Sequence, residues 1–330
     1  MPRKITTARR RCLMAALALA LSSLLTASAR ADDYPVRTIK LVVPFPPGGS
    51  ADSVPRILTD WLSRKLGQSV IIDNRAGAGG NIGAQFVAQA DPDGYTLLAA
   101  PPPPLVINQN LYPHLDFDPQ QFVPIVIIGS LPSVLVVNPD KIAANTVQEF
   151  IADARAKPGK ITDATQGNGT TSHLTSELFQ MMAHVSLQNV PYRGSAPALN
   201  DLIAGSVDCM FDNLGSSLPF VKAGKLKLLA VATEKRLASL PDTPTFAETL
   251  PGFASAAWYG VVAPAHTPTA VVDKINAAVN DALRDPEIVK RLTALAVEPV
   301  GGTPQATARY FQEEIARWKS VIVAAHVTLD

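Results

Sequence analysis

Short apolar runs alternate with longer segments of helical period along most of the chain. Residues 39–43 form the first run and predict a strand. The next segment carries Val54, Leu58 and Leu62 on one helical face and stops at Gly67. Alternation of this kind is typical of βαβ units that share a parallel sheet. The other elements expected in this series are strands at 70–72 and 95–99, a glycine-rich turn at 76–80, a helix at 82–90 and a stiff extended turn at Pro101-Pro102-Pro103-Pro104.

A second series of strands and helices follows. Two consecutive strands are predicted at 123–128 and 134–137, interrupted by Gly129-Ser130-Leu131-Pro132, and a new series begins at Thr146. The chain is therefore expected to cross to another lobe there. The segment 257–263 is expected to make the return crossing, because helices with a sheet-covering pattern follow it. The other elements expected in the second series are helices at 146–156, across Leu174, Leu178 and Met181, and after a capping Ser195, with strands at 207–211 and 226–232.

The pattern predicts an α/β protein of two lobes with a central cleft, joined by two crossing strands. Residues 32–132 and 257–330 would form lobe 1, and residues 133–256 would form lobe 2.

The first 31 residues have the pattern of a cleaved secretory signal peptide. Basic residues from Arg3 to Arg11 precede a thirteen-residue apolar run at 13–25, and Ala29-Arg30-Ala31 supplies a cleavage pattern. The run is shorter than the roughly 20 residues that a bilayer-spanning helix needs. We expect cleavage before Asp32 and a soluble product exported to the periplasm.

Charge and cysteine content narrow the functional classes. Removing residues 1–31 takes away six of the 29 basic residues and none of the 28 acidic ones, which leaves a net charge of −5. No basic patch favours nucleic acid as a partner. Cys12 lies in the signal segment, so Cys209 alone cannot form an internal disulfide and stability must come from core burial. No oligomerisation signal is present, and a monomer is expected.

Two loops of small residues, 46–52 and 167–173, each open into a predicted helix. Helix starts carry unpaired N–H groups and the positive end of the helix dipole, so the pair could hold a carboxylate from two sides. The alternative is that these glycine and hydroxyl residues only cap helices. Asp212, at the end of a predicted strand, could contact a donor group of the ligand or cap a loop.

Other chemistries have less support in the sequence. Gly77, Gly79, Gly80 and Gly83 resemble a dinucleotide fingerprint, but Ile82 stands where that motif requires Gly or Ala. We expect no cofactor. The five histidines lack the spacing of metal ligands, so no metal is expected either.

A secreted hydrolase using Ser172, His173 and Asp212 remains an alternative to binding alone. Adjacent Ser and His seldom point at each other, and the chain lacks a Gly-x-Ser-x-Gly elbow. The expectation is a chain without catalytic residues that is not an enzyme.

Several segments together resemble the Bug family, the solute-binding components of tripartite tricarboxylate transporter systems. The resemblance covers nearly all of the chain after the signal segment. The matching segments are VVPFPPGGSADSVPR (42–56), IIDNRAGAGGNIGAQFVAQADPDGYTLL (71–98), QGNGTTSHLTSELF (166–179), VPYRGSAPALNDLIAGSVDCMFDN (190–213), LPDTPTFAETLPGF (240–253) and AWYGVVAPAHTPTAVVDKIN (257–276).

The resemblance implies a type II periplasmic-binding-protein fold whose cleft holds a ligand carboxylate through backbone groups and bridging waters. The solute would be a small organic acid or amino acid, and the partner a membrane permease of the transporter or, alternatively, a sensor domain. Residues 162–166 and 101–104 depart from the pattern of many relatives. The ligand-binding residues carried over by position are Phe45, Pro47, Gly48, Gly49, Ser50, Asp52, Gly167, Asn168, Gly169, Thr170, Thr171, Ser172, His173, Arg193, Gly194, Ser195, Ala196 and Asp212.

Overall fold

The computed structural model describes residues 34–237, 239–324 and 327. The chain divides into a short unit, Met1–Val36, and a large unit, Arg37–Asp330, which holds all the helices and strands named below. The predicted signal segment 1–31 lies outside the described residues. Within the described part of the chain, no helix is both long enough and apolar enough to cross a membrane.

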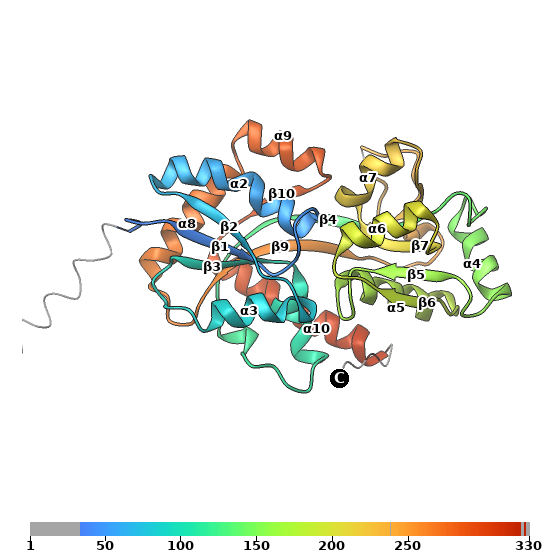
Figure 1. The fold of residues 1–330 in the computed structure, drawn as a ribbon, viewed down its shortest axis with the longest axis horizontal. Coiled ribbons are helices and arrows are strands. Elements are labelled where there is room, and N and C mark those ends of the chain that lie inside the picture. The colour runs from blue at the N-terminus through green and yellow to red at the C-terminus, as the bar shows by residue number, and fades with distance from the viewer. Residues whose placement is uncertain (1–33, 238, 325–326, 328–330) are drawn as a thin grey trace, which may run out of the picture. The chain divides into compact units, whose positions relative to one another are not determined.

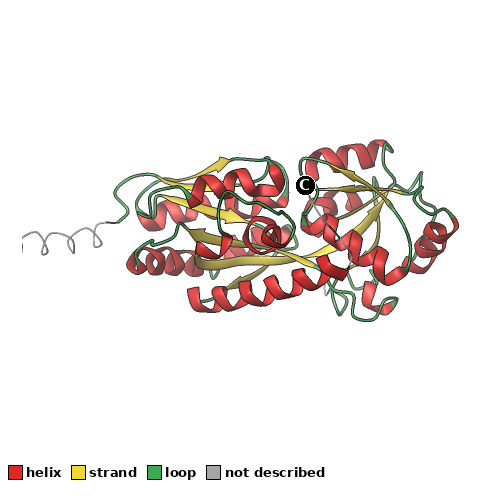
Figure 2. Cartoon of the chain, turned by 90° about the horizontal axis from the view of Figure 1, so that it is seen from below, coloured by secondary structure: helices red, strands yellow, loops and turns green. Residues whose placement is uncertain are grey.

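The first lobe is built on a sheet in which three parallel strands lie together at one edge. Strand β1 (Ile39–Val43) pairs in parallel with β2 (Val70–Asn74) and with β3 (Thr96–Ala100), which confirms the three strands expected from the apolar runs. Strand β9 (Ala256–Ala263) runs antiparallel beside β3. The helices of this lobe lie on both sides of the strands (Figure 1, Figure 2): α2 (Ser50–Leu66), α3 (Asn81–Ala88), α8 (Thr269–Ala282), α9 (Pro286–Ala294) and α10 (Pro304–Ala324).

The second lobe repeats the parallel arrangement. Strand β5 (Thr162–Thr165) pairs in parallel with β6 (Gln188–Pro191) and with β7 (Cys209–Asn213). Strand β8 (Lys227–Val231) completes the lobe beside the strand that both lobes share. The helices here are α4 (Val147–Ala156), α5 (Thr171–Ala183), α6 (Ser195–Ala204) and α7 (Leu214–Lys222).

One continuous strand, β4 (Val123–Val137), runs through both lobes. Residues 123–132 pair with β9, and residues 133–137 pair with β7 and β8. The sequence-based prediction of two strands interrupted at 129–132 was therefore wrong. The register shifts between Ile127 and Gly129 absorb the irregular residues without ending the strand. Glycine is required at 129, because a Cβ there would lie 2.6 Å from the carbonyl oxygen of Glu298 in β10 (Glu298–Gly301).

Other local predictions also need correction. Pro101–Pro104 do not form an extended turn, since Pro102 is already helical and a short helix begins at Pro103. The φ angle of proline suits the first turn of a helix, which explains the difference. Ser195 is the first residue of α6, and Gly194 occupies the N-cap position. Short helical turns, also missed, are η1 (Ala78–Gly80), η2 (Pro103–Ile107), η3 (Asn108–Asn110), η4 (Pro119–Gln121) and η5 (Phe246–Glu248).

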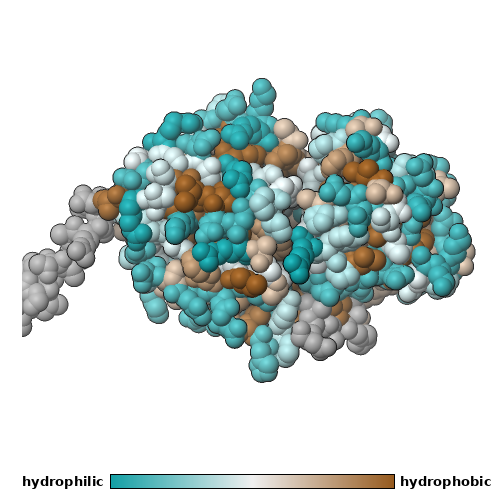
Figure 3. Space-filling view, in the orientation of Figure 1, coloured by the Kyte–Doolittle hydropathy of each residue, from teal (hydrophilic) through white to brown (hydrophobic). Residues whose placement is uncertain are grey.

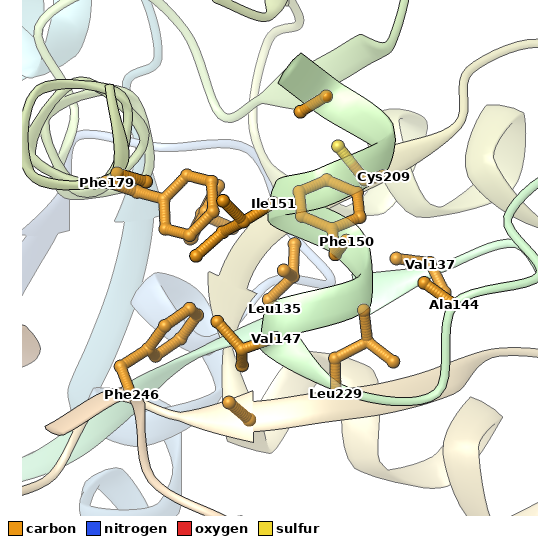
Figure 4. Close-up of a cluster of buried hydrophobic side chains, with 14 of the residues drawn as sticks. Leu135, Val137, Ala144, Val147, Phe150, Ile151, Phe179, Cys209, Leu229 and Phe246 are labelled. Carbon is orange, nitrogen blue, oxygen red and sulfur yellow. The ribbon is translucent and has the colours of Figure 1, made fainter. Parts of the chain in front are cut away.

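An aromatic cluster fills the core of the second lobe (Figure 4). The fully buried ring of Phe179 on α5 lies with its centroid 5.2–6.4 Å from four other phenylalanine rings. Edge-to-face and tilted pairs at these distances add to the free energy gained by burying the rings. The four partners of Phe179 are Phe150, Phe211, Phe246 and Phe253.

Truncating this central ring should strongly destabilise the fold. We expect Phe179→Ala to lower the free energy of unfolding by about 3–5 kcal/mol, because it removes a large buried side chain and leaves a cavity. Urea denaturation followed by circular dichroism measures the change. The control is Val323→Ala, at an exposed position, which should stay within about 0.5 kcal/mol. Equal losses in the two variants would contradict the central place of Phe179.

A carboxyl group is also buried in this lobe. Asp163 on β5 has no solvent exposure, and the thiol of Cys209 lies 3.8 Å from its Oδ1. Burial raises the pKa of Asp163 to about 7, against smaller lowering effects from Ser176, the backbone of Phe211 and Cys209. Between about pH 4 and pH 7 the folded protein therefore holds a proton here that the unfolded chain has released.

This difference makes stability depend on pH. The contribution of the protonated carboxyl is fully present below the unfolded pKa near 4 and is lost as pH rises towards 7. We expect the free energy of unfolding of the wild type to fall across that interval, and to fall less steeply in Asp163→Asn. Urea denaturation at pH 4, 5.5 and 7 tests this, with the exposed Asp140→Asn as control. If the free energy of unfolding falls with pH as steeply in Asp163→Asn as in the wild type, Asp163 is not the cause of the pH dependence.

Candidate functional site

A cavity of about 560 Å³ lies between the two lobes, a size that suits a small organic molecule. The surface in Figure 3 shows the seam where the lobes meet. Most of the lining is main chain and small or apolar side chains. The first lobe contributes Phe45, Pro46, Ala76, Gly77, Ala78, Gly79, Gly80 and Ile82, and the second contributes Gln166, Gly167, Tyr192, Arg193 and Gly194.

Three helices that begin beside the two lobes' facing loops have no side-chain cap. The N-cap positions of α2, α3 and α6 are Gly49, Gly80 and Gly194, and none of them offers an oxygen to the first turn. Several first-turn N–H groups of α2 and α3 are bonded elsewhere in the protein: that of Ser50 donates to Ser216 Oγ at 3.3 Å, and that of Asn81 donates to the carbonyl oxygen of Ala78. Each helix start still carries partial positive charge. Helix α5 differs, because Thr170 caps it by accepting a hydrogen bond from the N–H of His173.

The glycine-rich loop before α3 forms much of the first lobe's wall. Four successive residues, 77–80, have positive φ angles. This conformation favours glycine, because a Cβ atom makes it sterically unfavourable. The fully buried amide of Asn108 donates to the carbonyl oxygen of Gly79 at 3.2 Å and to Oδ1 of Asn81 at 2.6 Å, which fixes this loop. The loop was not predicted to bind ligand. Its density of glycines is the sequence signal that could have indicated a ligand-binding loop.

Asp212 organises the second lobe's wall from behind. Its carboxyl group is buried and accepts hydrogen bonds from Gln166 Nε2 at 2.7 Å, Ser195 Oγ at 3.0 Å and Ser217 Oγ at 2.5 Å. Burial raises its pKa, while these donors and the N–H of Asn213 act in the opposite direction. Asp212 does not line the cavity. Its place in the structure is to hold two residues that do border the cleft, Gln166 and Ser195.

The loop at 169–173 lies largely inside the second lobe. The N–H of Gly169 donates to Nδ1 of His173 at 3.1 Å, and the hydroxyl of Ser172 donates to the carbonyl oxygen of Phe211. Thr171 Oγ1 is buried, and no hydrogen-bond partner for it lies among the described residues. Ser172, His173 and Asp212 are each engaged with other groups, so the geometry does not assemble the hydrolase triad considered above.

The electrostatic character of the cavity is set by one side chain. Arg193 is the charged residue in the lining, and within the described ranges its guanidinium makes no ion pair. No carboxylate is among the described residues that line the cavity. A cation together with the partial positive charge of the helix starts favours an anionic guest. In the part of the chain that the structure covers, no cluster of His, Cys, Asp and Glu is suited to a metal ion.

The lobes touch beside this cavity. A Cβ on Gly48 would lie 3.7 Å from that of Ala196, which is ordinary van der Waals contact. Three side chains donate hydrogen bonds to the buried hydroxyl of Ser50, at the start of α2. The donors are Asn213 Nδ2 at 3.1 Å, Ser216 Oγ at 3.2 Å and Tyr259 OH at 2.8 Å. Asn213 and Ser216 belong to the second lobe and Tyr259 to β9. Ser50 on α2 thus contacts β9 of the same lobe and two residues of the second lobe, so the lobes are in contact in this structure.

The predicted site residues separate into three groups. Phe45, Gly167, Arg193 and Gly194 line the large cavity. Residues bordering a much smaller space beside it, where the lobes touch, are Pro47, Gly49, Ser50, Ser195 and Ala196, with Gly48 adjoining.

The remaining predicted residues contact other parts of the protein. Asp52 pairs with Arg56 at 2.6 Å and accepts from Asn74, and Asn168 accepts from Asn189 on the surface. The other members of this group, all buried, are Gly169, Thr170, Thr171, Ser172, His173 and Asp212. The ligand-binding role of the whole set stays a prediction.

Comparison with known proteins identifies a receptor family. The family described as "Tripartite tricarboxylate transporter family receptor" matches residues 54–327. Protein BugT of Bordetella pertussis is 37% identical over 301 residues, covering 90% of this chain and 92% of the relative. These matches confirm the resemblance to the Bug family that the sequence motifs suggested.

Two solved structures show the same fold with ligands bound. "R. palustris Rpa4515 with adipate" is 39% identical with a TM-score of 0.87, covering 89% of this chain and 99% of that chain. "MatC (Rpa3494) from Rhodopseudomonas palustris with bound malate" is 35% identical with a TM-score of 0.83, covering 88% and 100%. The two-lobed periplasmic-binding-protein fold is thereby confirmed. The family and these neighbours are ligand-binding receptors, which also confirms that the chain is not an enzyme.

The hydrogen bonds of the Ser50 hydroxyl predict that this residue holds the two lobes in contact. We expect Ser50→Ala to shift the protein towards a more open form, because it removes three side-chain hydrogen bonds, each worth about 0.5–1.5 kcal/mol. Small-angle X-ray scattering would report a larger radius of gyration. Ser53→Ala is the matched control, since the Ser53 hydroxyl bonds only within α2, to the carbonyl oxygen of Gly49. Identical scattering from the two variants would contradict this role of Ser50.

Proposed function

The chain belongs to the family of tripartite tricarboxylate transporter receptors, and on that premise we propose that it captures a small carboxylate-bearing solute between its lobes. The observation that carries the proposal is the charge of the cavity. Its described lining includes Arg193, an exposed residue that makes no ion pair within the described residues, and no carboxylate, and glycine-capped helix starts lie beside it. Burying an anion requires such compensation, and burying a cation would require the opposite.

The ligands of the solved neighbours agree with this choice. Adipate and malate, named with the two Rhodopseudomonas palustris proteins, are both dicarboxylates. Predominantly apolar walls with a few polar groups are typical of small-molecule sites, in which the polar groups fix orientation. The cavity here has that composition, with Phe45 and Ile82 on one side and Arg193 on the other.

Capture depends on closure of the lobes. In an open form the solute would bind one wall, and closure would bring in the N–H donors of the other and form the Ser50 contacts. Net interaction of about 8 kcal/mol would give a dissociation constant near micromolar, adequate for scavenging. The closed protein is what the membrane permease of a tripartite transporter would recognise.

The setting of this activity follows from the family and the N-terminal pattern. The family consists of periplasmic receptors, and residues 1–31 have the features of a cleaved export signal. The proposal therefore places a monomer beginning at Asp32 in the periplasm, with lobe boundaries near residues 132 and 257.

A thermal-shift screen of the protein from Asp32 onward tests the function. Ligand binding to the folded state raises the midpoint of unfolding, so one class of carboxylate should raise it by several degrees. The screen covers mono-, di- and tricarboxylates, aromatic acids and amino acids, after unfolding and dialysis to remove any carried-over solute. A response to amines alone, or to no carboxylate, would overturn the proposal.

The role of Arg193 gives a second, quantitative check. For the carboxylate that raises the unfolding midpoint in the screen, Arg193→Gln should raise the dissociation constant about tenfold. The reason is that charge-assisted hydrogen bonds contribute about 1.5–3 kcal/mol. Isothermal titration calorimetry measures the change. Arg309→Gln, at an exposed position on α10, is the control and should bind like the wild type. Equal affinities in both variants would remove Arg193 from the site.

A further inference from the structure

The orientation of one cavity side chain is fixed by the protein itself. Gln166 lines both the large cavity and the smaller space beside it. Its Nε2 donates to Oδ1 of Asp212 at 2.7 Å. The amide nitrogen of glutamine is only a donor, and the carboxyl oxygen it faces is an acceptor, so this contact decides which end of the amide faces Asp212.

The other end of the amide is left for the cavity. Within the described residues, no protein donor is bonded to Oε1 of Gln166, and this oxygen is not among the buried atoms that lack a partner. The two ends of a planar amide point in different directions, so Oε1 faces away from Asp212. Gln166 therefore has an acceptor oxygen with no bonded protein donor among the described residues, on a side chain that lines the cavity.

An acceptor at this point discriminates among substituents. A second carboxylate of the solute would be repelled by it, and a hydrogen atom would leave it without a bond. An ammonium group would need a carboxylate partner to be buried at low cost. Asp212 is enclosed behind Gln166 and Ser195 with three donors already bound, Asp52 is paired with Arg56, and Arg193 adds a positive charge. A neutral hydroxyl group fits the acceptor best.

We propose that Gln166, oriented by Asp212, is a specificity-determining residue that accepts a hydrogen bond from a hydroxyl group of the bound carboxylate. The inference rests on the proposed function and narrows its solute to hydroxy acids. Gln166 contacts the solute directly, and Asp212 is a positioning residue that acts through it.

Matched ligands that differ in one substituent test this. Three sets carry hydroxyl, hydrogen or ammonium on the same carbon: lactate, propionate and alanine; malate, succinate and aspartate; mandelate, phenylacetate and phenylglycine. Isothermal titration calorimetry gives their dissociation constants for the protein from Asp32. In the set that binds, the hydroxy acid should bind about tenfold more tightly than the hydrogen analogue, and the amino acid should bind weakest.

Substitutions at position 166 should change that order. In Gln166→Met, which has a similar length and no acceptor, the hydroxy acid and its hydrogen analogue should bind alike. In Gln166→Glu, the preference should move towards the amino acid, because a carboxylate can pair with its ammonium group. Gln120→Met, at an exposed position, is the control and should keep the wild-type order. Circular dichroism establishes that each variant is folded, and the Glu variant tests the proposal if the Met variant is not.

Asp212→Asn separates positioning from direct contact. An asparagine can present either end of its amide to Gln166, so the orientation is no longer enforced and the hydroxyl preference should shrink while binding of the hydrogen analogue persists. A merely structural effect would weaken both ligands equally.

The outcomes distinguish the two proposals. If acids bind but the wild type shows no hydroxyl preference, or if Gln166→Met keeps it, the role of Gln166 is refuted and the receptor function stands. If no carboxylate binds in any set, the proposed function fails, and this inference fails with it.

Discussion

The carboxyl group of Asp212 lies at the end of β7, shielded from solvent, with an amide and two hydroxyl groups donating to it. These donors come from three separate segments: the loop after β5, the start of α6 and the start of α7. Burying a carboxyl group costs free energy unless its hydrogen bonds are complete. Moving any one of the three donors away would therefore destabilise the fold, and this keeps each donor in place. The wall of the cleft in the second lobe owes its shape to this arrangement.

The cleft wall of the first lobe is also fixed in shape, but by backbone conformation. Its wall is mostly main chain, held in shape by residues 77–80 with positive φ angles and by the buried amide of Asn108. One wall is therefore fixed by side chains gathered around a carboxyl group, and the other by backbone conformation. In both lobes a helix that begins beside the cleft has a glycine at its N-cap position and no side-chain cap. A ligand anion placed between them would meet donors that need no rearrangement.

Much of the fold could be predicted from sequence because its signals are local. Helix α2 has an apolar stripe and the glycine stop at Gly67, and β1 is an isolated apolar run. Strand β5 could not be predicted in this way, because its buried positions include the polar residues Asp163 and Thr165. The continuity of β4 was hidden as well. Gly129 and Pro132 are strand breakers in isolation, and only the register shifts and the packing of β10 explain their presence.

The site residues also differ in whether local sequence or long-range contacts reveal their role. Of the residues that line the large cavity, Gly167 was identified from a loop that opens into a helix, a pattern visible in a short segment, and Phe45, Arg193 and Gly194 were identified only from the family resemblance. The part played by Gln166 depends on Asp212, which is 46 residues away in the chain, and the part played by Asn108 depends on a loop 29 residues earlier. Such contacts exist only once the lobes are folded. Asp212 itself was expected to contact the ligand; in the structure it is buried and is not among the residues that line the cavity.

Strand β4 has a mechanical consequence, since it belongs to both lobes without a break at the junction. The lobes are connected by a stretch of backbone whose hydrogen bonds are already made on both sides of the boundary at residues 132 and 133. Opening the cleft must then bend and twist a paired strand elastically instead of swinging two bodies about a slack linker. The separation of the lobes in this structure is in that sense a property of the sheet.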